Sequence, residues 1–372
     1  MISDAFPGRV GLQQRVIPGY RALFLDTLAE RCLGGLSVFA GQPLLNEGIH
    51  PAENLKIAQL VQGNNRYFFN PASPLFLCWQ SGFINWLEKW QPEVLIVEAN
   101  PRYLATRQAV AWMHQRERKV VGWGLGAPVI TGPLARLRRW ERSSFVGSLD
   151  AIVAYSQSGA AQYRAMGYPA QKVYVAFNAV ESAPHAALPE RSIDYKERSN
   201  VLFIGRLQTR KRVDLLLQAC ASLTSEQQPK LVIVGDGPAR LELENMAKQI
   251  YPQAEFVGAK QGAELEPHFA KADLFILPGT GGLAIQQAMA HGLPVIVAQG
   301  DGTQDDLVRN DNGWQIPPDD LPALTEILRR ALSDRARLRE MGKASYRIVA
   351  EEINVEKMAG TFLLVLNRLT GH

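Results

Sequence analysis

Short apolar runs alternate with longer amphipathic segments along almost the whole chain, and this alternation constrains the fold more than any other feature. The run KLVIVGDG at residues 230–237 is typical, because consecutive apolar residues lead directly into glycine. Strands that are apolar on both faces belong to parallel sheets covered by helices. The pattern therefore predicts an α/β protein with parallel, helix-covered sheets.

The apolar runs form two series, one in each half of the chain. The candidate strands of the first half are RVGL (9–12), LSVFA (36–40), EVLIVEA (93–99), KVVGWG (119–124) and AIVAYS (151–156). Those of the second half are NVLFIG (200–205), KLVIVGDG (230–237), AEFVG (254–258), DLFILPG (273–279) and LPVIVA (293–298). Segments such as YRALFLDTLAERC and TRQAVAWMHQRER lie between the runs and predict the covering helices.

Length and one polar stretch predict two domains. A chain of 372 residues exceeds the size at which a single hydrophobic core keeps growing. The polar stretch around residues 182–200 contains Pro184 and Pro189 and is typical of a linker. We therefore expect Rossmann-like, doubly wound domains at residues 1–185 and 195–354, with ligands bound in the cleft between them beyond the carboxyl ends of the strands.

Composition excludes several classes of protein. The apolar fraction of 47% and the charged fraction of 20% are ordinary for a folded globular chain. Cys32, Cys78 and Cys220 lack the spacing of a zinc site or a disulfide framework. The net charge of +4 suits an anionic ligand or a membrane surface and does not indicate nucleic acid. Without a signal peptide or a membrane-spanning run, we expect a cytoplasmic protein, at most peripheral to the inner face of the membrane.

The segment GRLQTRKRVD follows the first candidate strand of the second half and precedes a helix. Arg206 and Lys211 are five positions apart and would stand at the edge of the cleft. A guanidinium and an ammonium near a helix start can hold a diphosphate, since both charges and the helix dipole favour anionic oxygens. A solvated basic loop is an equally good interpretation of the spacing alone.

A glycine-rich turn follows another strand of the second half. Gly279, Thr280, Gly281 and Gly282 lead into a helix, and glycines leave the backbone amides accessible at a helix start. This turn could bind an anion or a hydroxyl, or it could be a tight strand-to-helix connection without a ligand. Gly235 lies at a third strand end beside Asp236, which we interpret as a turn or cap residue rather than a catalyst.

Taken in order, these segments resemble the donor domain of retaining glycosyltransferases of family 4, also called group 1, within the GT-B fold. The matching segments are GRLQTRKRVD, VIVGDGPAR, EFVG, ADLFILPG, GGLAIQQAMAHGLPVI and DNGWQIPPDD, from Val201 to Asp320. The first half matches only loosely, through DAIVAYSQSGAAQYRAMG and VYVAFNAVE. The resemblance implies an acceptor domain at 1–185, a donor domain at 195–354, and a last helix at about 355–372 that crosses back to the acceptor domain.

The resemblance also implies roles for particular residues. Arg206 and Lys211 would neutralise the donor diphosphate and take part in catalysis. Gln287 would bind the ribose hydroxyls, where the family usually has the second glutamate of its E-x7-E motif. The nucleobase would lie against Phe256, Val257 and Gly258. The other implied donor-binding positions are Gly205, Gly235, Gly279, Thr280, Gly281, Gly282 and Leu283.

Two positions depart from the family pattern. Gly279 stands where the motif has its first glutamate, so a side-chain contact to the donor sugar is missing. Leu125, in GWGLG, stands where related enzymes often carry histidine. Glu98, at the end of EVLIVEA, is a candidate for a catalytic role on the acceptor side, and a strand-end carboxylate that caps the next turn is the alternative.

Other motifs are absent or weak. The sequence contains no P-loop, no G-x-S-x-G, no H-E-x-x-H and no D-x-D pair, so we expect neither a metal nor a cofactor. GWGLGA (122–127) and GTGGLA (279–284) fit a loose dinucleotide pattern, but the first βαβ unit lacks one, which disfavours a dehydrogenase.

Residues 133–145, PLARLRRWERSSF, form a basic amphipathic segment with an aromatic residue. Such a helix can lie on an anionic membrane surface, which would suit a lipid-linked acceptor. A solvated helix that packs on the sheet through its Leu and Trp residues is the plain alternative.

The implied activity is transfer of a sugar from a UDP- or GDP-linked donor to a hydroxyl of a glycan or lipid-linked saccharide, with retention and without metal, in polysaccharide or glycolipid biosynthesis. The two departures leave other functions open. The chain could be a catalytically weak sugar-nucleotide-binding protein on the same scaffold, or a GT-B epimerase that acts on the nucleotide sugar itself.

Overall fold

The computed structural model describes residues 4–44, 47, 49–69, 73, 75–132, 134–185, 187–193, 198–281, 283–300 and 302–372. The chain divides into two compact units. The first contains residues Met1–Val180 and Val355–His372, and the second contains Glu181–Asn354. The chain therefore passes into the second unit and returns to the first for its last helix.

A parallel sheet with the order β3-β2-β1-β6-β7-β8-β9 forms the centre of the first unit, and β4 and β5 form a separate antiparallel pair. The strands are β1 (Val10–Gln14), β2 (Leu36–Ala40), β3 (Gln59–Gln62), β4 (Asn64–Phe68), β5 (Leu77–Ser81), β6 (Val94–Glu98), β7 (Lys119–Gly124), β8 (Ala151–Ala154) and β9 (Val173–Val175). The chain order reverses between β1 and β6, which is the point where such sheets bind ligands.

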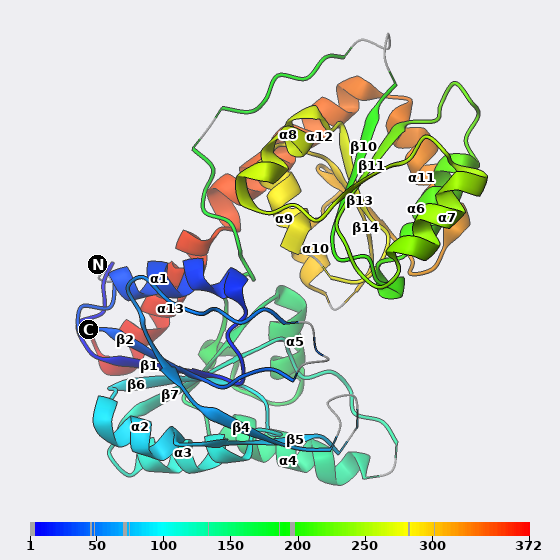
Figure 1. Ribbon diagram of the computed structural model, residues 1–372. Helices are drawn as coiled ribbons and strands as arrows, with labels where there is room; N and C mark the ends of the chain where they lie inside the picture. The colour runs from blue at the N-terminus through cyan, green and yellow to red at the C-terminus, as the bar shows by residue number, and fades with distance from the viewer. Residues whose placement is uncertain are drawn as a thin grey trace. The chain divides into compact units, whose positions relative to one another are not determined.

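Helices cover both faces of this sheet, with α2 and α3 on one side and α1 and α13 on the other (Figure 1). The helices are η1 (Gly19–Arg21), α1 (Ala22–Glu30), α2 (Phe83–Trp90), α3 (Leu104–His114), α4 (Ala135–Gly147), α5 (Gln157–Ala165), η3 (Ala170–Lys172) and α13 (Val355–Thr370). Alternate residues of β6 serve the two faces: Val94 and Ile96 belong to one core cluster, and Leu95 and Val97 to the other. Because both faces of such a strand are buried, its sequence is a continuous run of apolar residues.

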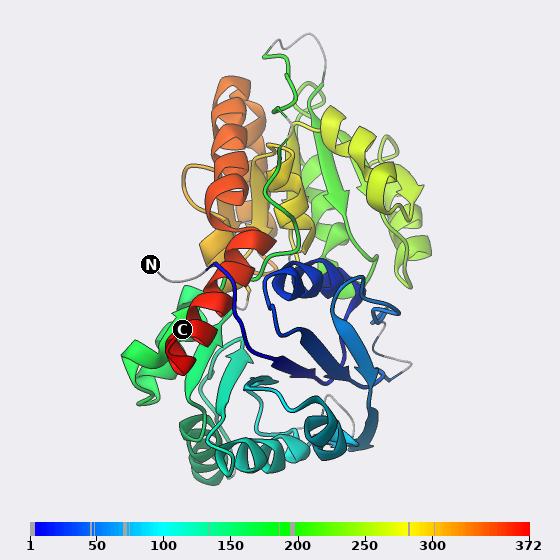
Figure 2. The ribbon, with the colours of Figure 1, turned by 90° about the vertical axis from the view of Figure 1, so that its left-hand side faces the viewer.

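The last helix, α13, completes the core of the first unit. Figure 2 shows α13 in red beside the strands of that unit. Phe362 is fully buried and its ring lies 5.3 Å from the ring of Phe24 in α1 and 5.2 Å from that of Trp123 in β7. Residues 355–372 are thus an integral part of the first unit's structure.

The second unit contains a parallel sheet with the order β12-β11-β10-β13-β14-β15. Its strands are β10 (Asn200–Ile204), β11 (Lys230–Val234), β12 (Glu255–Gly258), β13 (Leu274–Leu277), β14 (Val295–Ala298) and β15 (Gly313–Ile316). Counted within the unit, this is the Rossmann order 3-2-1-4-5-6, and the chain order reverses between β10 and β13.

Helices α6, α7 and α11 cover one face of this sheet, and α8, α9 and α12 the other (Figure 1). The helices are η4 (Thr209–Lys211), α6 (Val213–Ala221), α7 (Arg240–Ile250), η5 (Gly262–Leu265), α8 (Glu266–Lys271), α9 (Leu283–Ala290), α10 (Thr303–Leu307), α11 (Leu321–Leu332), α12 (Arg335–Arg347) and the π-helix η6 (Ile348–Glu352). The Asp320 and Asp334 carboxylates accept N-cap hydrogen bonds at the starts of α11 and α12.

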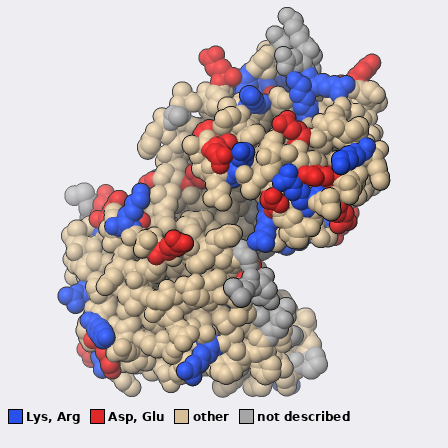
Figure 3. Space-filling view, in the orientation of Figure 1, with Lys and Arg blue, Asp and Glu red and all other residues tan. Residues whose placement is uncertain are grey.

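The visible surface carries no single-sign charge patch. In Figure 3, positive and negative side chains are interspersed on the second unit, and much of the face shown by the first unit is uncharged. Among the described residues, no helix combines the length and the apolar character needed to cross a bilayer.

Candidate functional site

Glycines lie at or just after the carboxyl ends of four neighbouring strands in the second unit, and the backbones approach one another closely there. The amide of Gly205, after β10, donates to the Val234 carbonyl at 3.0 Å, and the amide of Gly235, after β11, donates to the Gly258 carbonyl at 2.8 Å. Gly235 has φ of +147°, and a Cβ there would lie 1.9 Å from the Gly205 carbonyl oxygen. Only glycine allows the backbones to meet at this edge.

The basic loop after β10 contacts the glycine-rich turn after β13. The Lys211 ammonium donates to the Thr280 carbonyl at 2.7 Å, and the Thr280 amide donates to the Arg210 carbonyl at 3.0 Å. The Arg210 guanidinium lies 3.3 Å from the Thr280 hydroxyl. Two segments that are far apart in sequence therefore form one cationic surface at the point where the chain order of the sheet reverses.

Gly279 makes this approach possible. A Cβ at residue 279 would lie 2.2 Å from the Arg210 carbonyl oxygen and 2.6 Å from the Lys211 Cα. At Gly281, which has φ of +99°, a Cβ would lie 2.5 Å from the Lys211 Nζ. The turn thus has room for the lysine only because these positions lack side chains.

Burial changes the acidity of the lysine. Removal from water and, to a smaller extent, the neighbouring charge of Arg210 together lower the pKa of Lys211 to about 8. Both effects oppose the charged form, because an ammonium loses hydration and repels a guanidinium. An anionic ligand at this surface would reverse both effects.

The other predicted residues of the second unit lie around this edge. Arg206 is exposed on the loop after β10, next to the buried Leu207, whose amide donates to the Asp236 carbonyl at 2.9 Å. The Asp236 carboxylate accepts from the Gly237 amide at 2.6 Å and pairs with Arg240 at 3.0 Å, as a turn residue does. Gly282 lies outside the described residues.

The remaining positions lie on two further elements. Phe256, Val257 and Gly258 are half-buried residues of β12, the edge strand next to β11. Gly258 has φ of +78°. Leu283 is the first residue of α9 and is 36% exposed.

Gln287 lies one turn into α9 and has a partner that the sequence did not indicate. Its side-chain amide donates to the Glu181 carboxylate at 2.9 Å. The neighbouring Gln286 is buried, and its side chain donates to the Ile353 carbonyl at 2.6 Å and accepts from the Glu181 amide at 3.3 Å. Adjacent glutamines thus fix the segment at which the second unit begins.

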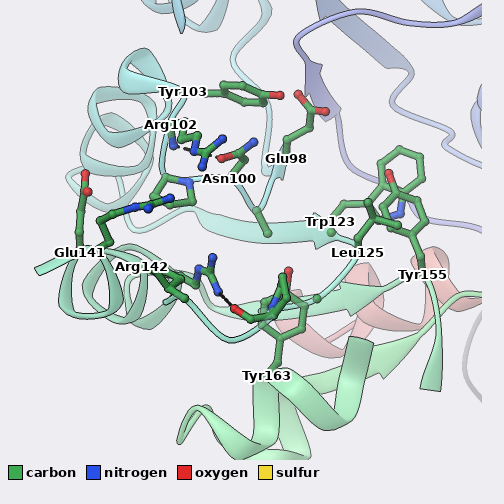
Figure 4. Close-up of a pocket in the computed structure, with 17 residues that line it drawn as sticks. Glu98, Asn100, Arg102, Tyr103, Trp123, Leu125, Glu141, Arg142, Tyr155 and Tyr163 are labelled. Carbon is green, nitrogen blue, oxygen red and sulfur yellow. Dashed lines mark hydrogen bonds between the residues drawn. The ribbon is translucent and has the colours of Figure 1, made fainter. Parts of the chain in front are cut away.

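A separate cavity of about 400 Å³ lies at the carboxyl edge of the first unit's sheet. Its wall comes from the loops after β6 and β7, from Tyr155 just after β8, and from α4 and α5. Figure 4 shows Glu98 and Tyr103 pointing toward one another on one side, with Arg142 and Tyr163 on another. Leu125, which is 54% exposed, and Trp123 also line the cavity.

Glu98 ends β6, where the chain order of this sheet reverses. Its carboxylate accepts a hydrogen bond from the Arg15 amide, after β1, at 2.6 Å. Burial raises the pKa of Glu98 to about 7, against the opposing effects of that hydrogen bond and of the Arg15 and Arg21 charges. A carboxyl group that titrates near neutrality in a cavity is a candidate for proton transfer, and it also caps the turn after β1.

Residues 187–348 match the model of the family described as Glycosyl transferases group 1. Most of the second unit thus matches the model of the group 1 glycosyltransferases. The chain is 31% identical over 155 residues to sulfoquinovosyl transferase SQD2 of Arabidopsis thaliana, and 33% identical over 179 residues to a GDP-mannose-dependent alpha-mannosyltransferase of Mycolicibacterium smegmatis. These matches cover 40% and 47% of this chain, but only 29% and 43% of the relatives' own length.

Solved structures show the same fold over nearly the whole chain. HepE of Anabaena in complex with UDP has a TM-score of 0.72 at 16% identity, covering 97% of this chain and 99% of that one. Sucrose-phosphate synthase of Thermosynechococcus elongatus has a TM-score of 0.70 at 18% identity, covering 98% and 99%. The expected GT-B fold, with Rossmann-like units, is confirmed.

The structure gives a reason for the glycine at residue 279, where the family pattern has its first glutamate. A glutamate at residue 279 would collide with the backbone of Arg210 and Lys211. Gln287, which stands where the motif has its second glutamate, is paired with a carboxylate from Glu181. A carboxylate is therefore still present beside this position, although it comes from another segment.

Helix α4 of this GT-B protein presents distinct faces. Leu137 and Trp140 are 57% and 68% exposed, whereas Phe145 and Val146 pack into the core. The alternative interpretation, in which Leu and Trp residues pack this helix on the sheet, is therefore wrong for Leu137 and Trp140. Among the described residues, no group of three or more potential metal-ligating side chains is assembled.

Proposed function

We propose that this chain transfers a sugar from a nucleoside-diphosphate sugar, UDP- or GDP-linked, to a hydroxyl acceptor, with retention at the anomeric carbon and without a metal. The contact of Lys211 with Thr280 supports this function most directly. It joins two cationic side chains and a glycine-rich helix start at the edge where Rossmann-like sheets bind nucleotides.

The donor diphosphate would be held by Lys211, Arg210, Arg206 and the amides around Thr280. HepE was crystallised with UDP, and the mycobacterial relative is named as GDP-mannose-dependent. Both nucleotides are therefore tested below. The nucleobase would lie against Phe256–Gly258, and the ribose beside Gln287 and Glu181.

In the proposed reaction, the bond between the anomeric carbon and the diphosphate oxygen breaks while a bond to the acceptor oxygen forms on the same face of the sugar. The acceptor proton passes to an oxygen of the departing diphosphate. Fixed cationic groups and amides would stabilise the charge that develops on the diphosphate. This scheme requires no metal and no cofactor besides the donor.

The acceptor would be a glycan or a lipid-linked saccharide bound in the cavity of the first unit, beside Glu98. Helix α4 adds support for a lipid-linked acceptor. Leu134, Leu137 and Trp140 are 57–68% exposed on α4 and at its start, and Arg136 and Arg139 are exposed on the same helix. Exposed apolar and basic side chains on one helix are typical of peripheral contact with an anionic membrane.

The experiment incubates the purified chain with UDP- and GDP-linked sugars, with and without candidate acceptors, and follows release of the nucleoside diphosphate and the fate of the sugar. Acceptor-dependent release with an α-configured product from an α-configured donor supports the proposal. Thermal stabilisation by a nucleotide without any turnover would identify a sugar-nucleotide-binding protein. Conversion of the donor to an epimer would identify an epimerase.

A further inference from the structure

The cavity of the first unit is lined by three arginines, and its charge is not balanced by its own residues. The charged side chains of its wall are Arg102, Arg138, Arg142, Glu98 and Glu141. Glu141 pairs at 3.5 Å with Arg107, which is not part of the wall. Glu98 is engaged by the Arg15 amide and titrates near neutrality.

Among the residues that the structure describes, none forms an ion pair with Arg102, Arg138 or Arg142. The Arg142 guanidinium donates to the Pro128 carbonyl at 2.5 Å, which leaves most of its donors unused. Within the part of the chain that the structure describes, the guanidinium groups of Arg102 and Arg138 make neither an ion pair nor a hydrogen bond. All three residues are half-buried, so their charges are less hydrated than they would be on an open surface.

These charges act on one another. Burial lowers the pKa of Arg142, the Tyr163 side chain opposes this shift, and the charges of Arg102 and Arg138 add to it. Like charges gathered in a partly enclosed space repel, and a bound anion would relieve that repulsion. A guanidinium group can also donate two parallel hydrogen bonds to the oxygen atoms of a phosphate or a carboxylate.

One further donor lies in the wall. Trp123 is 1% exposed, and its indole Nε1 has no hydrogen-bond partner among the described residues. A buried donor without a partner costs free energy unless a ligand or water satisfies it. An unsatisfied donor at the wall favours a ligand that carries acceptor atoms.

We propose that the cavity of the first unit binds an anionic group, a phosphate or a carboxylate, carried by the acceptor. The assignment to the acceptor rests on the proposed glycosyl transfer, whereas anion binding by the cavity does not. Arg102 and Arg138 are the principal ligands, with Arg142 beside them.

The experiment measures binding of glucose 6-phosphate, glucuronate and glucose to the full chain by calorimetry. The test variant is the double substitution R102Q/R138Q. The matched control, R136Q/R139Q, removes the same charge from exposed positions of α4, of which neither lines the cavity. We expect both anionic sugars to bind at least tenfold more tightly than glucose, and R102Q/R138Q to lose about tenfold per guanidinium. The control should bind as the wild type does.

Two results would overturn the proposal: no preference for the anionic sugars over glucose, or equal losses in the test and control variants. Loss of the anionic sugar in K211A, but not in R102Q/R138Q, would place it in the second unit and overturn the proposal as well. Binding of UDP and GDP is measured in parallel. If R102Q/R138Q still binds UDP or GDP, the anion site of the cavity is distinct from the donor site. If neither the wild type nor any variant binds UDP or GDP, that result counts against the proposed function alone.

Competition then identifies the source of the anion. Two kinds of vesicle are compared: mixed vesicles that contain both phosphatidylglycerol and phosphatidylcholine, and vesicles of phosphatidylcholine alone. If the anion belongs to a lipid, the mixed vesicles displace glucose 6-phosphate from the wild type and the vesicles of phosphatidylcholine alone do not. If neither kind of vesicle displaces it, the anion belongs to a soluble acceptor. Both outcomes retain the cavity as an anion site.

Discussion

The Lys211 ammonium lies 2.7 Å from the Thr280 carbonyl oxygen and donates a hydrogen bond to it. The two residues are 69 positions apart in sequence, on the loops that follow neighbouring strands β10 and β13. The contact holds a cation against a turn whose Thr280 amide donates to the Arg210 carbonyl. Its consequences can be tested in several ways.

Substitution K211A should lower turnover by about 10² to 10³, because it removes one preorganised group that stabilises charge on the departing diphosphate. The thermal midpoint should change little, since Lys211 is half-buried in a loop and its charge is opposed by burial. Initial rates and thermal unfolding are measured on the same preparation. Wild-type turnover in K211A would exclude the diphosphate role.

Donor affinity should fall as the pH rises above about 8. Below that value the Lys211 ammonium is charged and attracts the diphosphate, whereas above it the free protein holds a neutral amine that must first take up a proton. The loss is at most about tenfold per pH unit. Calorimetry with UDP and GDP at roughly pH 7 and pH 9 measures it. In K211R, whose side chain stays charged, the affinity should be flat over this range.

Substitution G279A should destabilise the second unit by about 1–3 kcal/mol, because the new Cβ would overlap the Arg210 carbonyl oxygen. Relief of this overlap requires a shift of the backbone, which costs more than the movement of a side chain. G279E, which introduces the glutamate usual in the family, should be no better. G147A is the control, since nothing lies within 4 Å of a Cβ at that position. Chemical denaturation compares the variants, and equal stability of G279A and G147A would contradict the steric account.

Substitution Q287E should lower the free energy of unfolding by about 1–3 kcal/mol, because it replaces a hydrogen bond to the Glu181 carboxylate with two carboxylates at close range. The swapped pair E181Q/Q287E should recover most of the loss, since the amide at residue 181 can donate to the new carboxylate. A double-mutant cycle measures the coupling. Additive effects of the single substitutions would mean that the contact contributes nothing.

Substitution E98Q should raise the stability of the chain at pH 8 by at most about 3 kcal/mol, which corresponds to the rise in the pKa of Glu98 from 4.5 to about 7. In the wild type, stability falls as the pH rises from 4.5 to 7, because the unfolded chain ionises this group before the folded chain does. The advantage of E98Q should therefore narrow below pH 7 and vanish below about pH 4.5. Unfolding curves at several pH values test this, and an advantage independent of pH would exclude ionisation as the cause.

The central strands could be predicted from sequence because burial on both faces leaves continuous apolar runs such as those of β6 and β13. The edge strands β3 and β15 could not, since QLVQ and GWQI have partly exposed and polar positions. The antiparallel β4 alternates exposed and half-buried residues and contains none of the long apolar runs that the analysis relied on.

The site was accessible to sequence reasoning where a glycine or a basic residue lies at the end of a strand or in the segment that follows it. Gly235, Gly279 and Lys211 are of this kind. Glu181 was not, because its partner Gln287 lies 106 positions away and only the folded chain brings them together. Arg138 was assigned to an amphipathic surface, since helical periodicity does not reveal which turn of α4 borders a cavity.

Because α13 supplies Phe362, Met358 and Leu366 to the core of the first unit, the second unit is inserted into the first along the chain. During synthesis, residues 181–354 leave the ribosome before α13 does. The second unit can therefore complete its fold during synthesis while the first unit still lacks α13.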